Sequence, residues 1–210
     1  MTNPYYILFA LVIGYALGRY RYRNPSFQNR GEALVTRELQ ASFKTPDFHL
    51  LNHITLKLKD GTTQIDHVLV SRFGVFVIET KDYNGWIFAN PKQATWTQVL
   101  YRWKFKFQNP ILQNFRHVKS VEAILDFLPT NAIKSAVIFV GDAKFQTDIP
   151  SGVYTLSGFV NYLQNSTEEV MTLNRVQFCV GRLETARLAI TGKTDLEHIK
   201  NLERRHGIKD

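Results

Sequence analysis

The sequence predicts an α/β fold in which a mixed central sheet is flanked by helices. Three observations carry this prediction. Residues 31–43 have helical periodicity and precede a meander of apolar strands. Asn109-Pro110 then offers a helix N-cap followed by proline at the first helical position. The 210 residues, 44% hydrophobic and 21% charged, suit a single globular domain with a sizeable core.

The N-terminus predicts a membrane anchor. Residues 4–18 are apolar apart from three tyrosines and two glycines, and a helix reaching Gly18 would be about 25 Å long. Three arginines follow (Arg19, Arg21 and Arg23), and the positive-inside rule places them in the cytoplasm. We therefore expect residues 1–23 to be a single-pass inner-membrane anchor and basic juxtamembrane segment, with the N-terminus outside and the main domain cytoplasmic. A buried N-terminal helix of a soluble protein is the alternative.

The rest of the chain divides into a linker at 24–30, a core at 31–150 and a C-terminal helical extension at 151–210 packed on that core. After the helix at 31–43, the apolar patterns predict strands at 50–58, 64–71, 75–81, 86–90, 95–107 and 135–141. Helices are expected from Asn109 to about 128, within 157–165, from a capping box at Ser166 to about 190, and after Thr194. A short strand is expected at 153–156.

The hairpin at 64–81 carries charges where an apolar pattern predicts burial. Glu79 and Lys81 are two residues apart on one strand, so their side chains share a face. A two-residue turn at Arg72-Phe73 would place Asp66 directly opposite Glu79, whereas a turn with Gly74 in a bulge would shift the partner by one residue. Either turn brings two carboxylates close together.

Two interpretations of this cluster remain open. Paired carboxylates hold a hard divalent cation such as Mg²⁺ through their oxygens, and Lys81 could assist hydrolysis of a phosphate ester there. The other interpretation is a structural ion-pair network at a solvated sheet end.

An ordered set of motifs resembles the nuclease-related domain, NERD, of the PD-(D/E)xK nuclease superfamily. The matching pieces cover about residues 30–128: Gly31-Glu32, IDH at 65–67, FGVFVIETK at 73–81, Gly85, Trp96, and NPILQN at 109–114. Ile65 departs from the proline in the superfamily's name. The resemblance implies a restriction-endonuclease-like fold. Some family members carry a zinc ribbon, which the single cysteine, Cys179, excludes here together with any internal disulfide.

The resemblance also implies site residues. Glu32, Asp66 and Glu79 match the carboxylates that hold Mg²⁺ or Mn²⁺, Lys81 matches the catalytic lysine, and Gln113 matches a position that assists on the following helix. Two alternatives remain open: Glu32 could simply favour a helix N-terminus, and His117, one turn after Gln113, could be an ordinary surface residue. His67 points away from Asp66 and is expected to be structural.

The segment 100–120 contains no acid and several bases. We expect Arg102, Lys104, Lys106, Arg116 and His117 to be the substrate-binding residues that follow a phosphate backbone. The interleaved aromatics, from Tyr101 to Phe107, are expected to lie in the core behind a lysine-guarded edge strand.

The sequence therefore predicts a membrane-anchored, metal-dependent nuclease that hydrolyses phosphodiester bonds of nucleic acid, with DNA the favoured substrate. The alternative is a catalytically inactive module of the same fold that binds nucleic acid or protein at the membrane. A structural membrane protein, in which the polar cluster is only an ion-pair network, is a third class.

Overall fold

The computed structural model describes residues 29–206 except residues 45 and 60. The predicted anchor at 4–18 and most of the linker lie outside these residues. Within the described part of the chain, no helix is long and apolar enough to cross a membrane.

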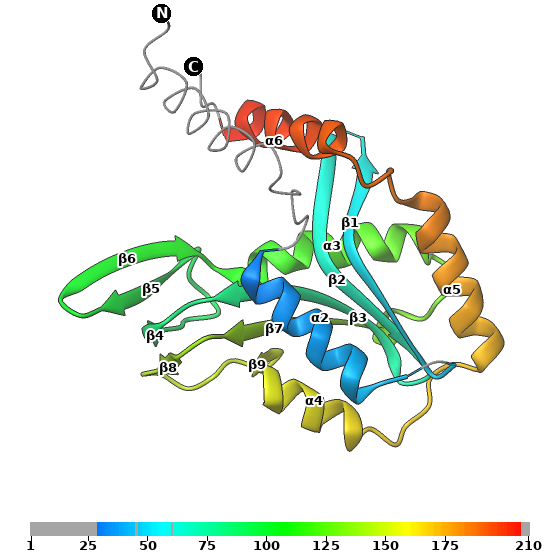
Figure 1. Cartoon of the computed structure of the whole chain (residues 1–210), viewed down its shortest axis with the longest axis horizontal. Helices are drawn as coiled ribbons and strands as arrows, with labels where there is room; N and C mark the ends of the chain where they lie inside the picture. Colours follow the sequence, from blue (N-terminus) through cyan, green and yellow to red (C-terminus); the bar gives the residue numbers. More distant parts are fainter. Residues whose placement is uncertain (1–28, 45, 60, 207–210) are drawn as a thin grey trace, which may run out of the picture.

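A five-stranded sheet forms the centre of the molecule (Figure 1). Its strand order is β1 (Phe48–Leu58), β2 (Gly61–Ser71), β3 (Gly74–Asp82), β7 (Ile133–Val140) and β9 (Val153–Thr155). The first three strands form an antiparallel meander, while β7 is parallel to both β3 and β9. The predicted mixed sheet is confirmed, and the continuous burial of β3 up to Thr80 reflects its central position.

A second sheet of four strands extends from one end of the first. It has the order β6 (Trp103–Gln108), β5 (Thr95–Leu100), β4 (Gly85–Phe88) and β8 (Ala143–Phe145). Strand β4 follows β3, and β8 follows β7, so the small sheet continues from the C-terminal ends of two central strands. Figure 1 shows the β5–β6 hairpin reaching away from the rest of the molecule.

Helices cover both faces of the large sheet. On one face, α2 (Arg30–Ser42) and α4 (Leu156–Gln164) contribute Leu39 and Phe159 to a cluster with Phe76 and Ile138. On the other face lie α3 (Pro110–Ile124) and α5 (Leu173–Ala186). The last helix, α6 (Gly192–His206), lies across the outer ends of β1 and β2 (Figure 1), and a 3₁₀ turn (Thr130–Ala132) precedes β7.

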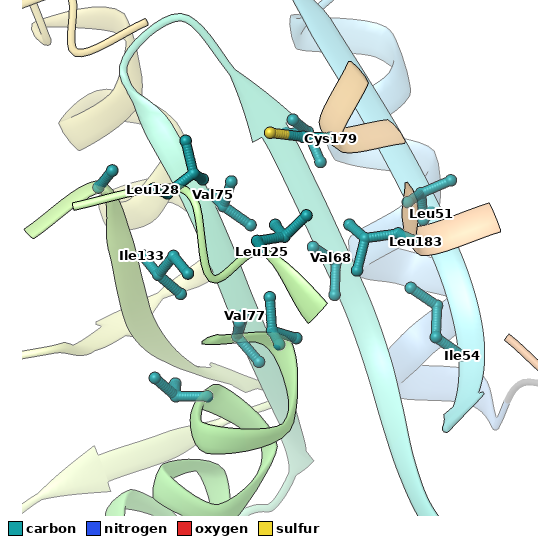
Figure 2. Packing of buried hydrophobic residues seen from close by; sticks show 14 of the residues in the cluster. Leu51, Ile54, Val68, Val75, Val77, Leu125, Leu128, Ile133, Cys179 and Leu183 are labelled. Atoms are coloured by element: carbon teal, nitrogen blue, oxygen red, sulfur yellow. The ribbon is translucent and has the colours of Figure 1, made fainter. Parts of the chain in front are cut away.

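Figure 2 shows the core on the α3 and α5 face, where Leu125, Leu183 and Cys179 meet the sheet residues Val68 and Val77. All five side chains are fully buried. Burial raises the pKa of the Cys179 thiol to about 11, so this cysteine packs as a neutral apolar group.

Two predicted elements are wrong. The segment 95–107 is not one strand, because a turn at Tyr101-Arg102, with Tyr101 at φ +55°, folds it into the β5–β6 hairpin. The helix expected from Ser166 instead begins at Leu173, after Thr172, whose hydroxyl accepts from the Arg175 backbone N–H. Residues Val170 and Met171 before it bond to the Arg72 carbonyl of the β2–β3 turn, which holds this stretch in a non-helical path.

Candidate functional site

The site is centred on the C-terminal end of β3. Glu79 is buried, with 3% of its surface exposed, and Lys81 lies two residues on, at the edge of the covered region. Lys81 Nζ donates to Glu79 Oε1 at 2.6 Å and to Gln113 Oε1 at 3.0 Å. The predicted sharing of a face is therefore realised, and the ammonium is held between two oxygens from different elements.

Helix α3 supplies Gln113 and His117, one turn apart. The ring of His117 is buried, its Nδ1 lies 2.8 Å from Thr63 Oγ1, and its Nε2 lies 3.4 Å from Glu79 Oε2. Thr63 fixes the ring on the β2 side, so that the second nitrogen points at the carboxylate. His117 thus lies in the Glu79 cluster on the same side of α3 as Gln113, and it is not the ordinary surface residue of the alternative interpretation.

Each polar residue of the NPILQN motif at the start of α3 makes hydrogen bonds that the structure identifies. Asn109 is the N-cap: its Oδ1 accepts from Ile111 N at 2.9 Å, and its Nδ2 donates to the loop carbonyl of Gln93 at 2.8 Å. Asn114 is fully buried and donates to Val77 O and Ser135 Oγ, both at 2.8 Å. These bonds fix the start of α3 against β3 and β7, and thereby place Gln113 beside Lys81.

Asp66 joins the cluster at a position where the β2–β3 ladder of hydrogen bonds has ended. The β2–β3 register confirms the two-residue turn at Arg72-Phe73, but the ladder stops at His67 opposite Ile78, one pair short of Asp66 and Glu79. Asp66 Oδ2 instead accepts from the Thr80 backbone N–H at 2.7 Å. The carboxylate therefore replaces a ladder carbonyl and stays beside the Glu79 side chain.

Glu32 enters from the N-terminus of α2. Asn29 caps this helix, accepting from the Glu32 N–H at 3.0 Å, and its amide also contacts Glu32 Oε1. At Gly31 a Cβ would lie 2.8 Å from Asp82 Cβ and 3.0 Å from a Val140 methyl. Only glycine lets α2 approach the ends of β3 and β7 this closely, which explains the Gly-Glu pair.

Burial and mutual repulsion shape the acidity of the three carboxylates. Burial, followed by the charges of Glu79 and Glu32, raises the pKa of Asp66 well above its usual value. Burial also raises the pKa of Glu32. Burial likewise acts to raise the pKa of Glu79, but the hydrogen bonds and positive charge of His117 and Lys81 outweigh it and lower that pKa. The cluster thus gathers more negative charge than Lys81 alone balances.

The chemistry of this donor set fits a hard divalent cation, because three carboxylates that repel one another are relieved by a shared positive charge. Asp66 Oδ2 and Glu79 Oε1 each accept one hydrogen bond, which leaves lone pairs on both groups. This fit lies in the chemistry of the donors and not in their arrangement, because no group of three or more His, Cys, Asp or Glu residues in the described part of the chain is placed so that it could hold a metal ion.

His53 also lies in this region, although no motif or periodicity in the sequence selects it. The β1–β2 ladder is interrupted where His53 faces Asp66, and His53 has φ +50°, a strained value for a non-glycine residue. Its Nε2 lies 3.1 Å from Asp195 Oδ1 of α6, and its charge acts on Glu32. The break in the ladder and the contact with α6 depend on the tertiary fold, so the local pattern of apolar and polar residues does not predict either of them.

The other predicted substrate contacts lie apart from this cluster on exposed surface. Lys104 and Lys106 are on β6, Arg102 is in the turn before it, and Arg116 is on α3. The aromatics expected in the core are divided: Phe107 packs with Tyr83 and Trp96, whereas Tyr101, Trp103 and Phe105 are exposed to 94%, 61% and 50%. The turn at Tyr101 carries the end of the hairpin beyond the core.

Comparisons with known proteins agree with the motif resemblance. The family model of the nuclease-related domain, NERD, matches residues 28–140, a range that includes all five predicted catalytic residues. An uncharacterized protein of Bacillus anthracis is 43% identical over 97 residues, which are 46% of this chain and 45% of that protein. The chain thus aligns with less than half of the length of that curated relative. No solved structure matches.

Proposed function

Because the chain belongs to the nuclease-related domain family, we propose that it is a metal-dependent nuclease that hydrolyses phosphodiester bonds in nucleic acid, with DNA the favoured substrate. The observation that carries the proposal is the convergence of Asp66, Glu79 and Lys81 at one strand end, with Gln113 bonded to the lysine. A structural ion pair between Lys81 and Glu79 does not need further carboxylates beside it. A cation site does, and Asp66 lies close enough to Glu79 and Glu32 to be repelled by both.

In this proposal Glu32, Asp66 and Glu79 hold Mg²⁺ or Mn²⁺. Such an ion supplies Lewis-acid polarisation of a phosphoryl oxygen and acidifies water near neutral pH. Lys81, oriented by Glu79 and Gln113, carries a fixed positive charge that can offset the charge developing on the phosphate. His117 keeps Glu79 ionised by contacting its other oxygen.

The test is cleavage of a labelled DNA by the full-length chain in Mg²⁺ or Mn²⁺, with EDTA as the metal-free reference. Glu79→Gln preserves the side-chain shape but removes the charge, and Lys81→Ala removes the ammonium. We expect each change to lower the rate by at least about 10²-fold, the usual contribution of a group acting in proton transfer or charge stabilisation.

Lys119→Ala is the matched control, because this exposed lysine of α3 interacts with Glu122 and the Phe115 ring, both on its own helix. Its cleavage rate should equal that of the wild type. Binding of nucleic acid without cleavage in either metal would instead identify the inactive binding module, and cleavage that survives both site variants would rule out this site.

Membrane attachment through residues 4–18, with the domain on the cytoplasmic side, is a separate proposal supported by the apolar run and the arginines after it. Fractionation of cells that make the full chain tests it. The protein should remain with the membranes after washing in high salt, and deletion of residues 1–23 should release it.

A further inference from the structure

The small sheet has an outer face that no helix within residues 29–206 covers. We define this outer face as the side chains of β4, β5, β6 and β8 that share one side in the observed register: Trp86, Phe88, Thr97, Val99, Lys104, Lys106 and Lys144. They form two rows across the strands. One row runs Lys144, Trp86, Val99, Lys104, and the other runs Phe88, Thr97, Lys106.

Where the small sheet meets the large one, its two faces differ in burial, although Trp103 and Phe105 at the hairpin end of the inner side are also exposed. On the inner face Ile87 and Trp96 are fully buried, and they pack with Phe139 of the large sheet. On the outer face Trp86 is 52% exposed and Phe88 is 40% exposed. Large aromatics left in water on an ordered sheet indicate a surface for recognition.

All charged residues on the four strands of the small sheet are positive. Strands β4, β5, β6 and β8 contain no acidic residue, and the three lysines of the outer face flank its aromatics. Bases interleaved with exposed rings match the chemistry of a single-stranded nucleic acid, which offers phosphates together with uncovered base faces. A duplex hides those base faces within its stack.

We propose that the outer face binds single-stranded nucleic acid, with unpaired bases stacked on Trp86 and Phe88 and phosphates paired with Lys104, Lys106 and Lys144. The two rings are two residues apart on one strand, which is about 7 Å. That separation is about twice the 3.4 Å rise per nucleotide of B-DNA. Bases that use both rings must therefore be drawn apart from each other, which an unpaired strand allows without the cost of opening a duplex.

The chain path connects this face to the site. Strand β4 begins four residues after Lys81, and β6 ends five residues before Gln113, so β4, β5 and β6 form an excursion between these two residues. The bond between Lys81 and Gln113 closes that excursion at its base. The identification of single strands as the substrate rests on the proposed nuclease function, and the sheet would hold the strand while the carboxylates act on it.

The experiment measures binding of a fluorescein-labelled 20-nucleotide thymidine oligomer to the full-length chain by anisotropy, in EDTA so that no cleavage occurs. A duplex of the same length is the comparison. We expect the single strand to bind at least tenfold more tightly. Trp86→Ala with Phe88→Ala should weaken single-strand binding by more than tenfold, because each stacked base contributes about 1–3 kcal/mol.

Two controls separate stacking from folding. Trp86→Phe retains a ring and should bind nearly as the wild type does, while Trp103→Ala removes an equally exposed ring from the opposite side of the sheet and should have no effect. Circular dichroism melting checks that the double variant is folded. Cleavage in Mg²⁺ is measured in parallel for the wild type and for the variants of the outer face, so that failure of catalysis and failure of this face are distinguishable.

Three results would overturn the proposal. The first is a duplex bound as tightly as the single strand. The second is a folded Trp86→Ala, Phe88→Ala variant that binds like the wild type. The third is competition by vesicles rich in phosphatidylglycerol that depends on the same rings, because this would make the outer face a membrane contact.

Discussion

The two sheets of this protein handle polar side chains in opposite ways. The large sheet is covered on both faces by helices and buries Glu79 and most of Asp66 at the end of its central strands. The small sheet leaves one face open, and that face carries Trp86, Phe88 and three lysines. One sheet therefore concentrates negative charge away from water, and the other displays positive charge and rings to it.

The difference matches the two proposed roles, a cation site in the large sheet and a nucleic-acid surface on the small one. Buried carboxylates that repel one another reduce the stability of the fold, and in the proposed function a bound cation relieves that repulsion. Trp86 and Phe88 are only partly buried, and in the proposed role of the outer face their rings contact a ligand with flat apolar faces. A polyanion would contact the small sheet, and a cation the large one.

The largest effect we expect separates two of the three tryptophans of the small sheet, Trp96 and Trp86. Trp96→Ala should reduce the free energy of unfolding by about 4 kcal/mol, since this side chain is 1% exposed and its Nε1 donates to Asn90 O at 2.8 Å. Trp86→Ala should cost less than about 1 kcal/mol, because the ring is half in water. Urea denaturation of both variants measures the difference.

Equal losses of stability for the two variants would contradict the distinction between an inner and an outer face. A Trp86 that is needed for folding belongs to the core, and its exposure would then have no bearing on ligand binding.

The second prediction concerns the acid sensitivity of the large sheet. His67 is buried, its Nδ1 lies 3.0 Å from Asn52 Oδ1, and burial lowers its pKa from 6.5 to about 4. The unfolded chain therefore takes up this proton before the folded one does. Stability from the neutral ring is complete above pH 6.5 and is lost as the pH falls toward 4, by about 3 kcal/mol in all.

Urea melts between pH 7.5 and pH 4 test this. His67→Asn can still donate to Asn52 but does not titrate, so its stability should fall by less over that interval than that of the wild type. His49→Asn, at a half-buried histidine near the start of β1 that contacts Gln177 of α5, is the comparison variant. Parallel curves for the wild type and His67→Asn would show that another group sets the acid sensitivity.

The same comparison shows what the sequence could and could not predict. The cluster of Asp66, Glu79 and Lys81 could be predicted because strand parity and a two-residue turn are local properties. The exposure of Trp103 and Phe105 could not, because the alternation of rings and lysines continues unbroken through the turn at Tyr101. Periodicity shows which residues share a face, but only the tertiary fold shows whether that face is covered.

The third prediction concerns the close packing of Gly31 against β3 and β7, which places Glu32 beside the other carboxylates. Gly31→Ala adds a methyl group that would meet Asp82 Cβ and a Val140 methyl, so α2 must shift away from the ends of β3 and β7. We expect a loss of about 1–3 kcal/mol from overpacking, together with a larger fractional loss of cleavage than the stability change alone would cause. Gly181→Ala is the control, since a Cβ at that helical position meets nothing within 4 Å.

The smallest effect has the opposite sign. Asp66→Asn should make the metal-free protein more stable by roughly 1 kcal/mol at pH 8, because it removes a buried charge repelled by Glu79 and Glu32. Asparagine can still accept from the Thr80 N–H. Since the folded pKa of Asp66 is raised, the wild type loses stability as the pH rises above the unfolded value of 3.8 through the folded one, and the two proteins should converge near pH 4.

Added Mg²⁺ or Mn²⁺ should reverse the ranking at pH 8, because an ion that binds only the folded wild type stabilises it in proportion to the logarithm of its concentration. Thermal melts with and without metal measure both effects, and Asp126→Asn, an exposed position after α3, should follow the wild type. A metal-free Asp66→Asn protein that is less stable at pH 8 would identify this carboxylate as a structural acceptor. The buried charge of the large sheet would then have a structural role, as the acceptor of the Thr80 N–H. The contrast between the two sheets would no longer support a cation site in one and a polyanion site in the other.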